Sequence, residues 1–225
     1  MDRCSNAGMG KIPVCTFAKP PMPGRVKTRL AARIGYEAAA SLASAMFCDV
    51  WSTAEQTPGV TPILAAAAEG AFPVDISPER FWLQGEGELG VRIETILRKG
   101  LREATAAIAL GADSPLITTA HLTAALRELE SHDAVIGPSH DGGFYLLGLR
   151  SCPPGLLDDL PWSTMKTAEK TSERLRSRGM SVSRIALLED VDTPDDLELL
   201  RERLKTTAPE IAPATRRCLL EWLAS

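Results

Sequence analysis

The stretch that decides the fold is Ile108-Ala109-Leu110-Gly111-Ala112-Asp113-Ser114-Pro115. Residues 105–110 form a short, largely apolar run, which is typical of a buried strand. The run breaks at Gly111, and Pro115 prevents the strand from continuing because proline has no backbone N–H. A helical pattern begins near Thr119. We therefore expect Asp113 at the carboxyl end of a central strand, in a turn that leads into a helix.

An acid at this position has two interpretations. Ligands of open α/β sheets bind beyond the carboxyl ends of the strands. There, Asp113 would hold a divalent cation, which in turn would bind phosphate oxygens. Alternatively, Asp113 caps the helix that follows. A single carboxylate does not distinguish a metal ligand from a helix cap, so other parts of the chain are needed to decide.

Strand patterns alternate with helical patterns along the chain. Strands are expected over residues 12–18, 61–67, 81–84, 105–110, 133–137, 144–149 and 181–188, and helices over 36–51, 89–101, 119–129, 166–178, 193–204 and 211–223. This order predicts an α/β fold, a three-layer α/β/α sandwich with a mostly parallel mixed sheet. We expect a single domain over residues 1–225, with 206–225 as a C-terminal helical extension. The last helix packs either on the core or on a second copy of the chain, which would make a homodimer.

Composition limits the classes of partner. The chain has 225 residues, 44% of them hydrophobic and 24% charged, with a net charge of −4. These values are typical of a soluble globular protein and argue against nucleic acid as a partner. No apolar run reaches the 18 residues of a membrane span, and residues 1–9 lack the apolar segment of a secretory signal. The five scattered cysteines form no CxxC pair, which favours a reducing, cytoplasmic location without structural zinc.

A basic loop follows the first expected strand. Residues 3–36 contain no acid, and the segment 19–30 carries Lys19, Lys27 and Arg29 among three prolines and Gly24. Gly24 lets the backbone approach a ligand closely. Backbone amides together with two cations make a suitable phosphate cradle, although the Walker pattern is absent. The alternative is a solvated basic loop without a ligand.

A second candidate segment begins at Gln84. The glycines Gly85, Gly87 and Gly90 have the form GxGxxG, but the motif lies in the middle of the chain, which disfavours a dinucleotide-binding fold. Instead, the glycines would make room for a nucleoside, with Gln84 contacting its base or ribose. The alternative is an ordinary start of a helix.

Three later positions complete the candidate set. Asp141-Gly142-Gly143 separates two strands and is expected to be a hairpin turn; if functional, Asp141 faces the pocket and the glycines admit an acceptor. Trp162 either stacks on a sugar or packs beneath its own loop. Asp192 follows the last strand, either as part of a helix cap or, if that strand neighbours the Asp113 strand, as a second ligand of one Mg²⁺ or Mn²⁺.

Six blocks of sequence together resemble a known family. They are, in order, FAKPPMPGRVKTRL, QGEGELGVR, GADSPLIT, GPSHDGGFYLLGL, LPWST and EDVDTPDDL. Over residues 12–205 the chain resembles the bacterial GT-A-fold nucleotide-diphospho-sugar transferases of the arsenosugar-biosynthesis type. That family is related to the molybdenum-cofactor and phospholactate nucleotidyltransferases.

The resemblance implies roles for particular residues. It implies a nucleotide pocket with Lys27 and Arg29 near the phosphates, and Asp113 as the metal-binding acid. By similarity to the related nucleotidyltransferases, Asp192 would be the second metal ligand. Asp141 with its two glycines matches the acceptor side. The chain departs from the family at Ala112, where a hydroxyl residue is common, and residues 206–225 lie beyond the resemblance.

These observations lead to one main hypothesis and two alternatives. The main hypothesis is a metal-dependent glycosyltransferase that uses a nucleotide-diphospho-sugar, with Asp141 orienting or deprotonating a hydroxyl of a small-molecule acceptor. The first alternative is a nucleotidyltransferase that moves NMP from a nucleoside triphosphate to a phosphorylated small molecule. The second is a non-catalytic nucleotide-binding protein.

Overall fold

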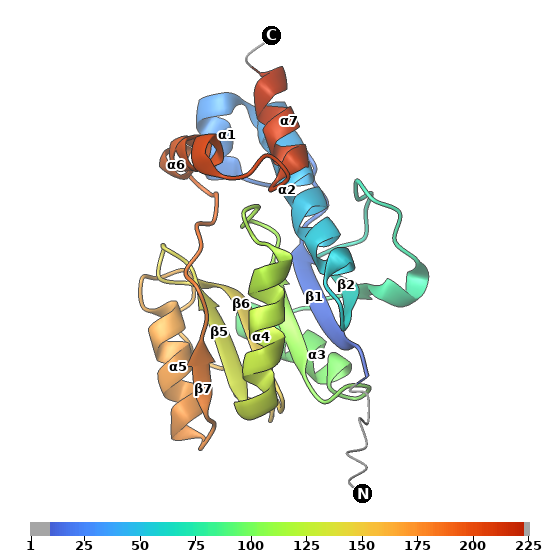
Figure 1. The fold of residues 1–225 in the computed structure, drawn as a ribbon, viewed down its shortest axis with the longest axis vertical. Helices are drawn as coiled ribbons and strands as arrows, with labels where there is room; N and C mark the ends of the chain where they lie inside the picture. Colours follow the sequence, from blue (N-terminus) through green and yellow to red (C-terminus); the bar gives the residue numbers. More distant parts are fainter. Residues whose placement is uncertain (1–9, 223–225) are drawn as a thin grey trace, which may run out of the picture.

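The computed structural model describes residues 10–222, so the expectation about residues 1–9 lies outside the described part of the chain. Its centre is a seven-stranded sheet in the order β3-β2-β1-β4-β6-β5-β7 (Figure 1). The strands are β1 (Ile12–Ala18), β2 (Val60–Ala66), β3 (Phe81–Leu83), β4 (Ala107–Gly111), β5 (Ala134–Pro138), β6 (Phe144–Leu149) and β7 (Val182–Arg184). β6 runs antiparallel to β4 and β5, whereas the other neighbouring strands are parallel.

Helices cover both faces of this sheet. They are α1 (Thr28–Ile34), α2 (Tyr36–Gln56), α3 (Leu89–Gly100), α4 (Thr119–Ser131), α5 (Thr167–Ser177), α6 (Pro194–Thr206) and α7 (Pro213–Glu221), with a 3₁₀ turn η1 (Pro78–Arg80) before β3. α2 and α4 pack on one face, and α3 and α5 pack on the other. The predicted three-layer α/β/α sandwich with a mixed sheet is confirmed.

β4 shows why the central strands are apolar without interruption. Ile108 and Leu110 belong to the core under α2 and α4, while Ala107 and Ala109 belong to the core under α3 and α5. A strand buried on both faces has no polar side, so its sequence does not alternate. β1 lies beside β4 with Phe17 in register with Gly111, and the loop after β1 therefore lies beside the turn after β4.

The structure corrects two expectations about local structure. The segment 19–30 is not irregular throughout, because α1 begins at Thr28; Leu30 is buried in the cluster that α1 shares with α2, α6 and α7. The last strand is also shorter than expected, and it pairs with β5 at the edge of the sheet rather than with the Asp113 strand.

The C-terminal helix packs on α2 of the same chain. One carboxylate oxygen of Asp49 accepts a hydrogen bond from the backbone N–H of Ala214 at 2.9 Å, and the other accepts from Thr215 at 2.8 Å. Asp49 thus binds free N–H groups at the start of α7 from a neighbouring helix. α1, α6, α7 and the start of α2 form a helical group beyond one end of the sheet (Figure 1).

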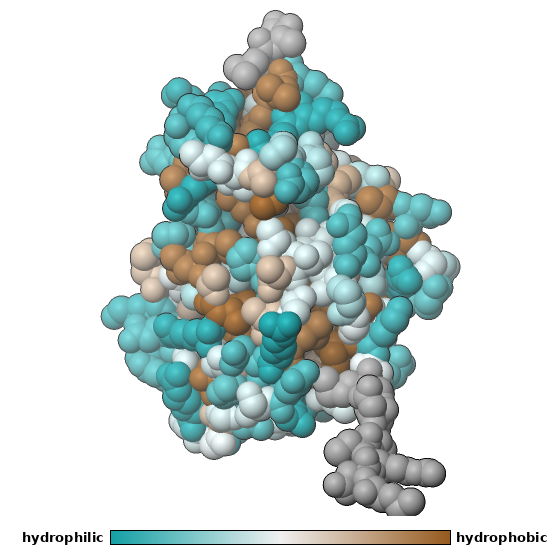
Figure 2. Space-filling model, in the orientation of Figure 1, coloured by the Kyte–Doolittle hydropathy of each residue, from teal (hydrophilic) through white to brown (hydrophobic). Residues whose placement is uncertain are grey.

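The surface of this face is mixed in character. In Figure 2, apolar side chains gather across its middle, below the helical group, with polar residues above and below them. None of the helices within residues 10–222 is long and apolar enough to cross a membrane.

Candidate active site

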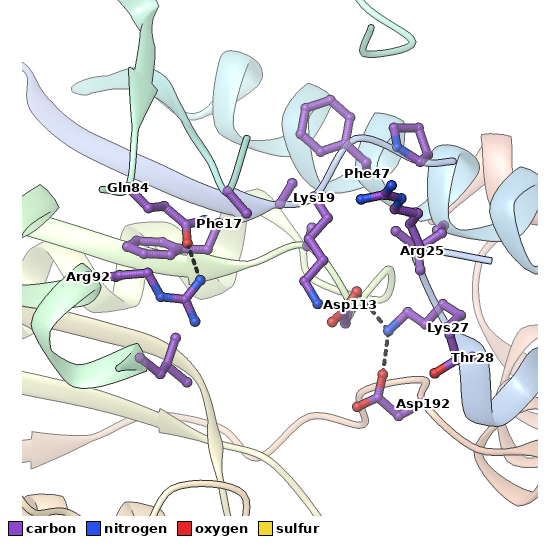
Figure 3. A pocket seen from close by; sticks show the side chains of 17 residues that line it. Phe17, Lys19, Arg25, Lys27, Thr28, Phe47, Gln84, Arg92, Asp113 and Asp192 are labelled. Atoms are coloured by element: carbon purple, nitrogen blue, oxygen red, sulfur yellow. Dashed lines mark hydrogen bonds and ion pairs between the residues drawn. The ribbon is translucent and has the colours of Figure 1, made fainter. Parts of the chain in front are cut away.

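Three charged side chains meet beyond the carboxyl end of β4. The ammonium nitrogen of Lys27 lies 2.8 Å from Oδ1 of Asp113 and 2.6 Å from Oδ1 of Asp192 (Figure 3). Only 5% of the Lys27 side chain is exposed, against 49% for Asp113 and 47% for Asp192. A buried cation therefore joins two carboxylates that still face solvent.

The pKa of Lys27 reflects this arrangement. Burial by itself lowers the pKa of the ammonium, but the charges of Asp113 and Asp192 and their hydrogen bonds outweigh it and hold the pKa above its usual value. Burial likewise opposes ionisation of Asp192, but Lys27 holds the pKa of that carboxyl below its usual value. Lys27 and Asp192 are therefore both charged at neutral pH.

Neither acid is the cap of the helix that follows it. The N-cap of α4 is Thr118, which forms a capping box with His121. The N-cap of α6 is Thr193, as expected, and its capping-box partner is Asp196. The side chain of Asp113 therefore does not cap α4 and instead pairs with Lys27 in the site.

Asp192 reaches Asp113 by a route that the sequence did not indicate. Leu188 forms an isolated bridge with Ser139 just beyond β5, and the chain then crosses toward β4. There the backbone N–H of Val191 donates to the carbonyl oxygen of Asp113 at 3.0 Å. The two acids are therefore brought together by the segment after β7, not by neighbouring strands.

A cavity of about 360 Å³ opens on one side of these acids. We call it the cationic cavity because four basic side chains line it, Lys19, Arg25, Lys27 and Arg92 (Figure 3). Its apolar walls include Phe17 and Phe47, and in Figure 3 Lys19 points toward Asp113. The volume suits a nucleotide, since small-molecule pockets are commonly about 300–1,000 Å³.

Three of the six residues expected at the nucleotide line this cavity, and three do not. Lys19, Lys27 and Gln84 are lining residues, whereas Gly24, Arg29 and Gly85 are not. Arg29 nevertheless acts on the site through its charge, which helps lower the pKa of Asp192.

Gln84 differs from expectation in its contacts. Its amide nitrogen donates to the carbonyl oxygen of Ala65 at 2.7 Å, and its amide oxygen accepts from Arg92 at 3.0 Å. Gln84 is buried, so its amide positions Arg92 rather than standing free for a base or ribose. Arg92 was not predicted as a site residue, although it closes the QGEGELGVR block and could have been found there.

A second cavity of about 250 Å³ lies on the other side of Asp113. We call it the aromatic cavity because Phe17, Phe144, Tyr145 and Trp162 line it. Both cavities share three lining residues, Phe17, Leu89 and Asp113. Asp113 therefore lies at the boundary between the two cavities.

The hairpin turn contributes a carboxylate to the aromatic cavity. Oδ1 of Asp141 accepts hydrogen bonds from the hydroxyl of Ser139 and, at 2.8 Å, from the backbone N–H of Gly143. Asp141 and Gly143 line the cavity, but Gly142 does not. Gly142 has φ +83° and packs under the backbone of Met165.

Asp190 also lines the aromatic cavity and was not predicted as a site residue. Burial and the charge of Asp141 raise its pKa to about 6. Its place in the DVD triplet of residues 190–192 was the available signal, because alternate residues of an extended segment point to opposite sides.

Trp162 packs against its neighbours and also lines the aromatic cavity, and its stacking on a sugar stays a prediction. Its ring lies edge-on to Phe144 with centroids 6.0 Å apart, and it lines the aromatic cavity while half-buried. The loop that carries it is fastened to α3 by Glu94, whose two carboxylate oxygens accept from the backbone N–H groups of Gly155 and Leu157. Glu94 is buried and was not foreseen.

The donor set fits a divalent cation that is shared with a ligand. Within residues 10–222 no three His, Cys, Asp or Glu side chains gather as a complete metal site. However, oxygens of Asp113 and Asp192 converge on a single positively charged atom, that of Lys27. Mg²⁺ in proteins is commonly held by one or two carboxylates together with substrate phosphates, and two carboxylates beside a cationic cavity match that pattern.

Sequence comparison adds evidence about the family. Residues 54–164 match the family described as "Uncharacterized protein conserved in bacteria (DUF2064)". The chain is also 30% identical over 189 residues to a phosphoenolpyruvate guanylyltransferase of Conexibacter woesei, an alignment that covers 78% of this chain and 82% of the relative.

Solved structures agree on the fold. A candidate nucleotide-diphospho-sugar transferase from Desulfovibrio desulfuricans G20 has a TM-score of 0.85 and 27% identity, with 96% of both chains covered. A cytidylyltransferase from Leptospira borgpetersenii has a TM-score of 0.55 at 10% identity, also with 96% of both chains covered, and supports the fold alone. The expected nucleotide-diphospho-sugar transferase fold is thereby confirmed. The chain belongs to the family of the Conexibacter guanylyltransferase and is a nucleotide-dependent transferase.

Proposed function

We propose that this protein transfers a sugar from a nucleotide-diphospho-sugar to a hydroxyl group of a small-molecule acceptor. The observation that carries the proposal is the pair of cavities that meet at Asp113, one lined by four cations and the other by aromatic rings and carboxylates. In this arrangement the nucleotide diphosphate occupies the cationic cavity. The acceptor occupies the aromatic cavity, and the bond to be broken lies beside Asp113.

In this proposal the basic side chains bind the diphosphate and the two carboxylates hold the metal ion. Lys19, Arg25 and Arg92 bind the diphosphate oxygens, because charge-assisted hydrogen bonds to phosphate are among the strongest available. Asp113 and Asp192 hold Mg²⁺ or Mn²⁺. When bound, the ion supplies positive charge that stabilises the leaving diphosphate.

Asp141 acts on the acceptor. Its hydrogen bonds from Ser139 and Gly143 fix the carboxylate in the turn. A carboxylate fixed in this way orients the acceptor hydroxyl and accepts its proton as the hydroxyl attacks the sugar. The narrower arsenosugar-type specificity implied by the resemblance stays a prediction.

A nucleotidyltransferase is the second candidate, and two observations favour it. Four cations suit a triphosphate as well as a diphosphate. The relative from Conexibacter woesei is named for guanylyl transfer. The two candidates differ in which bond breaks, so their products distinguish them.

Product analysis is the decisive experiment. The full chain is incubated with Mn²⁺ and either nucleotide-diphospho-sugars or nucleoside triphosphates, and the released phosphates are separated by ion-exchange chromatography. Glycosyl transfer releases nucleoside diphosphate from a sugar nucleotide. Pyrophosphate release from a triphosphate, with no sugar nucleotide consumed, would contradict the proposal and favour the second candidate.

Ligand-induced stabilisation tests the binding half of the proposal. A ligand at 100 times its Kd adds about 2.7 kcal/mol to the free energy of unfolding, which a thermal shift detects readily. We expect this shift with a sugar nucleotide plus Mn²⁺ in the wild type and its loss in Asp113→Asn. Asp75→Asn, an exposed carboxylate that lines neither cavity, is the matched control and should retain the shift.

A further inference from the structure

The charge of the aromatic cavity is opposite to that of its neighbour. Among the described residues that line it, Asp113, Asp141 and Asp190 carry carboxylates, and no lysine or arginine is present. The basic side chains near Asp113 line the cationic cavity instead. From this contrast we propose that the acceptor is an uncharged or cationic hydroxyl compound with an apolar face, and not a phosphorylated or carboxylic acid.

This inference rests on the proposed function, because it assumes that the aromatic cavity holds the acceptor. An anionic acceptor would enter beside the carboxylates of Asp141 and Asp190, and none of the described residues that line this cavity is a lysine or arginine that could offset them. Asp113 differs because it is paired with Lys27. Like charges at close range are unfavourable, and more so where the protein excludes water. Sites that recognise phosphate or carboxylate supply arginine, lysine or free backbone N–H groups.

Two N–H groups at the nearest helix start already have acceptors. Thr167, the first residue of α5, lines the aromatic cavity. However, its backbone N–H donates to the carbonyl oxygen of Thr164, and the next N–H, that of Ala168, donates to Gly142. Glu169 adds a negative charge to the same turn. These two N–H groups are therefore occupied and do not offset the charge of the carboxylates.

The apolar wall of the aromatic cavity indicates which kind of ligand surface would pack against it. Phe144 and Trp162 meet edge to face, and Leu89 and Ile93 of α3 complete an apolar surface. Aromatic rings of this kind pack against the apolar faces of ring compounds. Ser139 provides a hydroxyl in the same cavity, but its hydrogen bond goes to Asp141. The cavity thus combines an apolar wall with carboxylates that accept hydrogen bonds from hydroxyl groups.

The inference bears on the choice between the two functions. The nucleotidyltransferase alternative requires a phosphorylated acceptor, which the carboxylates of the aromatic cavity disfavour. The acceptor class also differs from the phosphoenolpyruvate in the name of the Conexibacter relative.

Matched pairs of probes test the acceptor class directly. Phenyl β-glucoside is compared with its 6-phosphate, and glycerol with glycerol 3-phosphate, by tryptophan fluorescence of the full chain with saturating nucleoside diphosphate and Mn²⁺. We expect the neutral phenyl glucoside to bind at least tenfold more tightly than its phosphate. Trp162→Phe should remove most of the signal, which would place the probe in the aromatic cavity. Equal binding of both members, no binding of either, or tighter binding of the phosphate would overturn the inference.

Two variants test whether the charge of the cavity causes the preference for the neutral probe. Asp190→Asn removes a carboxylate, and Ser163→Lys adds a cation at an exposed lining position. Each should reduce the preference for the neutral probe at least threefold, provided that circular dichroism shows an unchanged fold. Unaltered preference in both folded variants would contradict the charge argument.

A parallel nucleotide measurement separates the two proposals. If a nucleotide shifts the melting temperature but the probe pairs are not distinguished, the acceptor inference fails while the proposed function stands. If no nucleotide shifts the melting temperature, the proposed function itself fails, and the acceptor inference, which rests on it, fails with it.

Discussion

The ammonium nitrogen of Lys27 lies 2.8 Å from a carboxylate oxygen of Asp113, at the point where the two cavities meet. Lys27 also contacts Asp192, so one buried cation is shared by both acids that would hold the metal. A divalent cation and Lys27 therefore compete for the same oxygens. We infer that the lysine turns toward the phosphates when metal and nucleotide bind together.

Removal of the Lys27 charge should separate metal binding from nucleotide binding. In Lys27→Met the carboxylates lose their counter-ion, so Mn²⁺ alone should stabilise the variant more than the wild type. Nucleotide should bind at least tenfold more weakly, because a phosphate contact worth about 1.4 kcal/mol or more is lost. Thermal shifts with Mn²⁺, and with Mn²⁺ plus nucleotide, measure both effects. An unchanged response to Mn²⁺ alone would show that the lysine does not compete with the ion.

Asp49 should stabilise the C-terminal helix. Asp49→Ala removes both acceptors for the first N–H groups of α7, and loss of such a cap costs about 1–2 kcal/mol. We expect a lower midpoint in urea unfolding with an unchanged slope. Asp49→Asn retains one acceptor oxygen and should fall between the wild type and the alanine variant. Equal midpoints for all three would mean that α7 is held by its apolar contacts alone.

Glu94 should position the acceptor loop. Glu94→Ala leaves the backbone N–H groups of Gly155 and Leu157 without their acceptor. The cost is roughly 1–3 kcal/mol for the buried N–H of Leu157 and less for the half-buried N–H of Gly155. The loop with Trp162 should loosen, so the KM for the acceptor should rise while the KM for the donor changes little. Limited proteolysis should cut within residues 151–165 faster than in the wild type. An equal rise in both KM values would contradict a role confined to the acceptor side.

The turn at Gly142 should tolerate no side chain. A Cβ there would lie 2.2 Å from the backbone of Met165, and φ is +83°. Gly142→Ala should therefore lower the melting temperature far more than Gly24→Ala. Gly24 also has a positive φ, of +75°, but a Cβ there meets nothing within 4 Å, so only the backbone conformation is penalised, by about 1–2 kcal/mol. Equal losses in calorimetry would show that contact with Met165 is unimportant.

Much of the fold was predictable because its signals are local. β1 and β6 have the bounds that their apolar runs predicted, and the cap at Thr193 follows from the residues beside it. α1 was missed because three prolines just before it suggested a loop, while the burial of Leu30 that stabilises it depends on distant helices. The short β7 was overestimated because its apolar residues continue past the end of the strand.

The sequence by itself determined the order of strands and helices and the position of Asp113 after a buried strand, because burial on both faces of a sheet makes a strand apolar throughout. Only the tertiary structure decided how the site is assembled. Lys27 and Asp192 are 165 residues apart, and Glu94 and Leu157 are 63 apart. Contacts over such separations depend on how the chain crosses the edge of the sheet, and they leave no periodic pattern in the residues that make them.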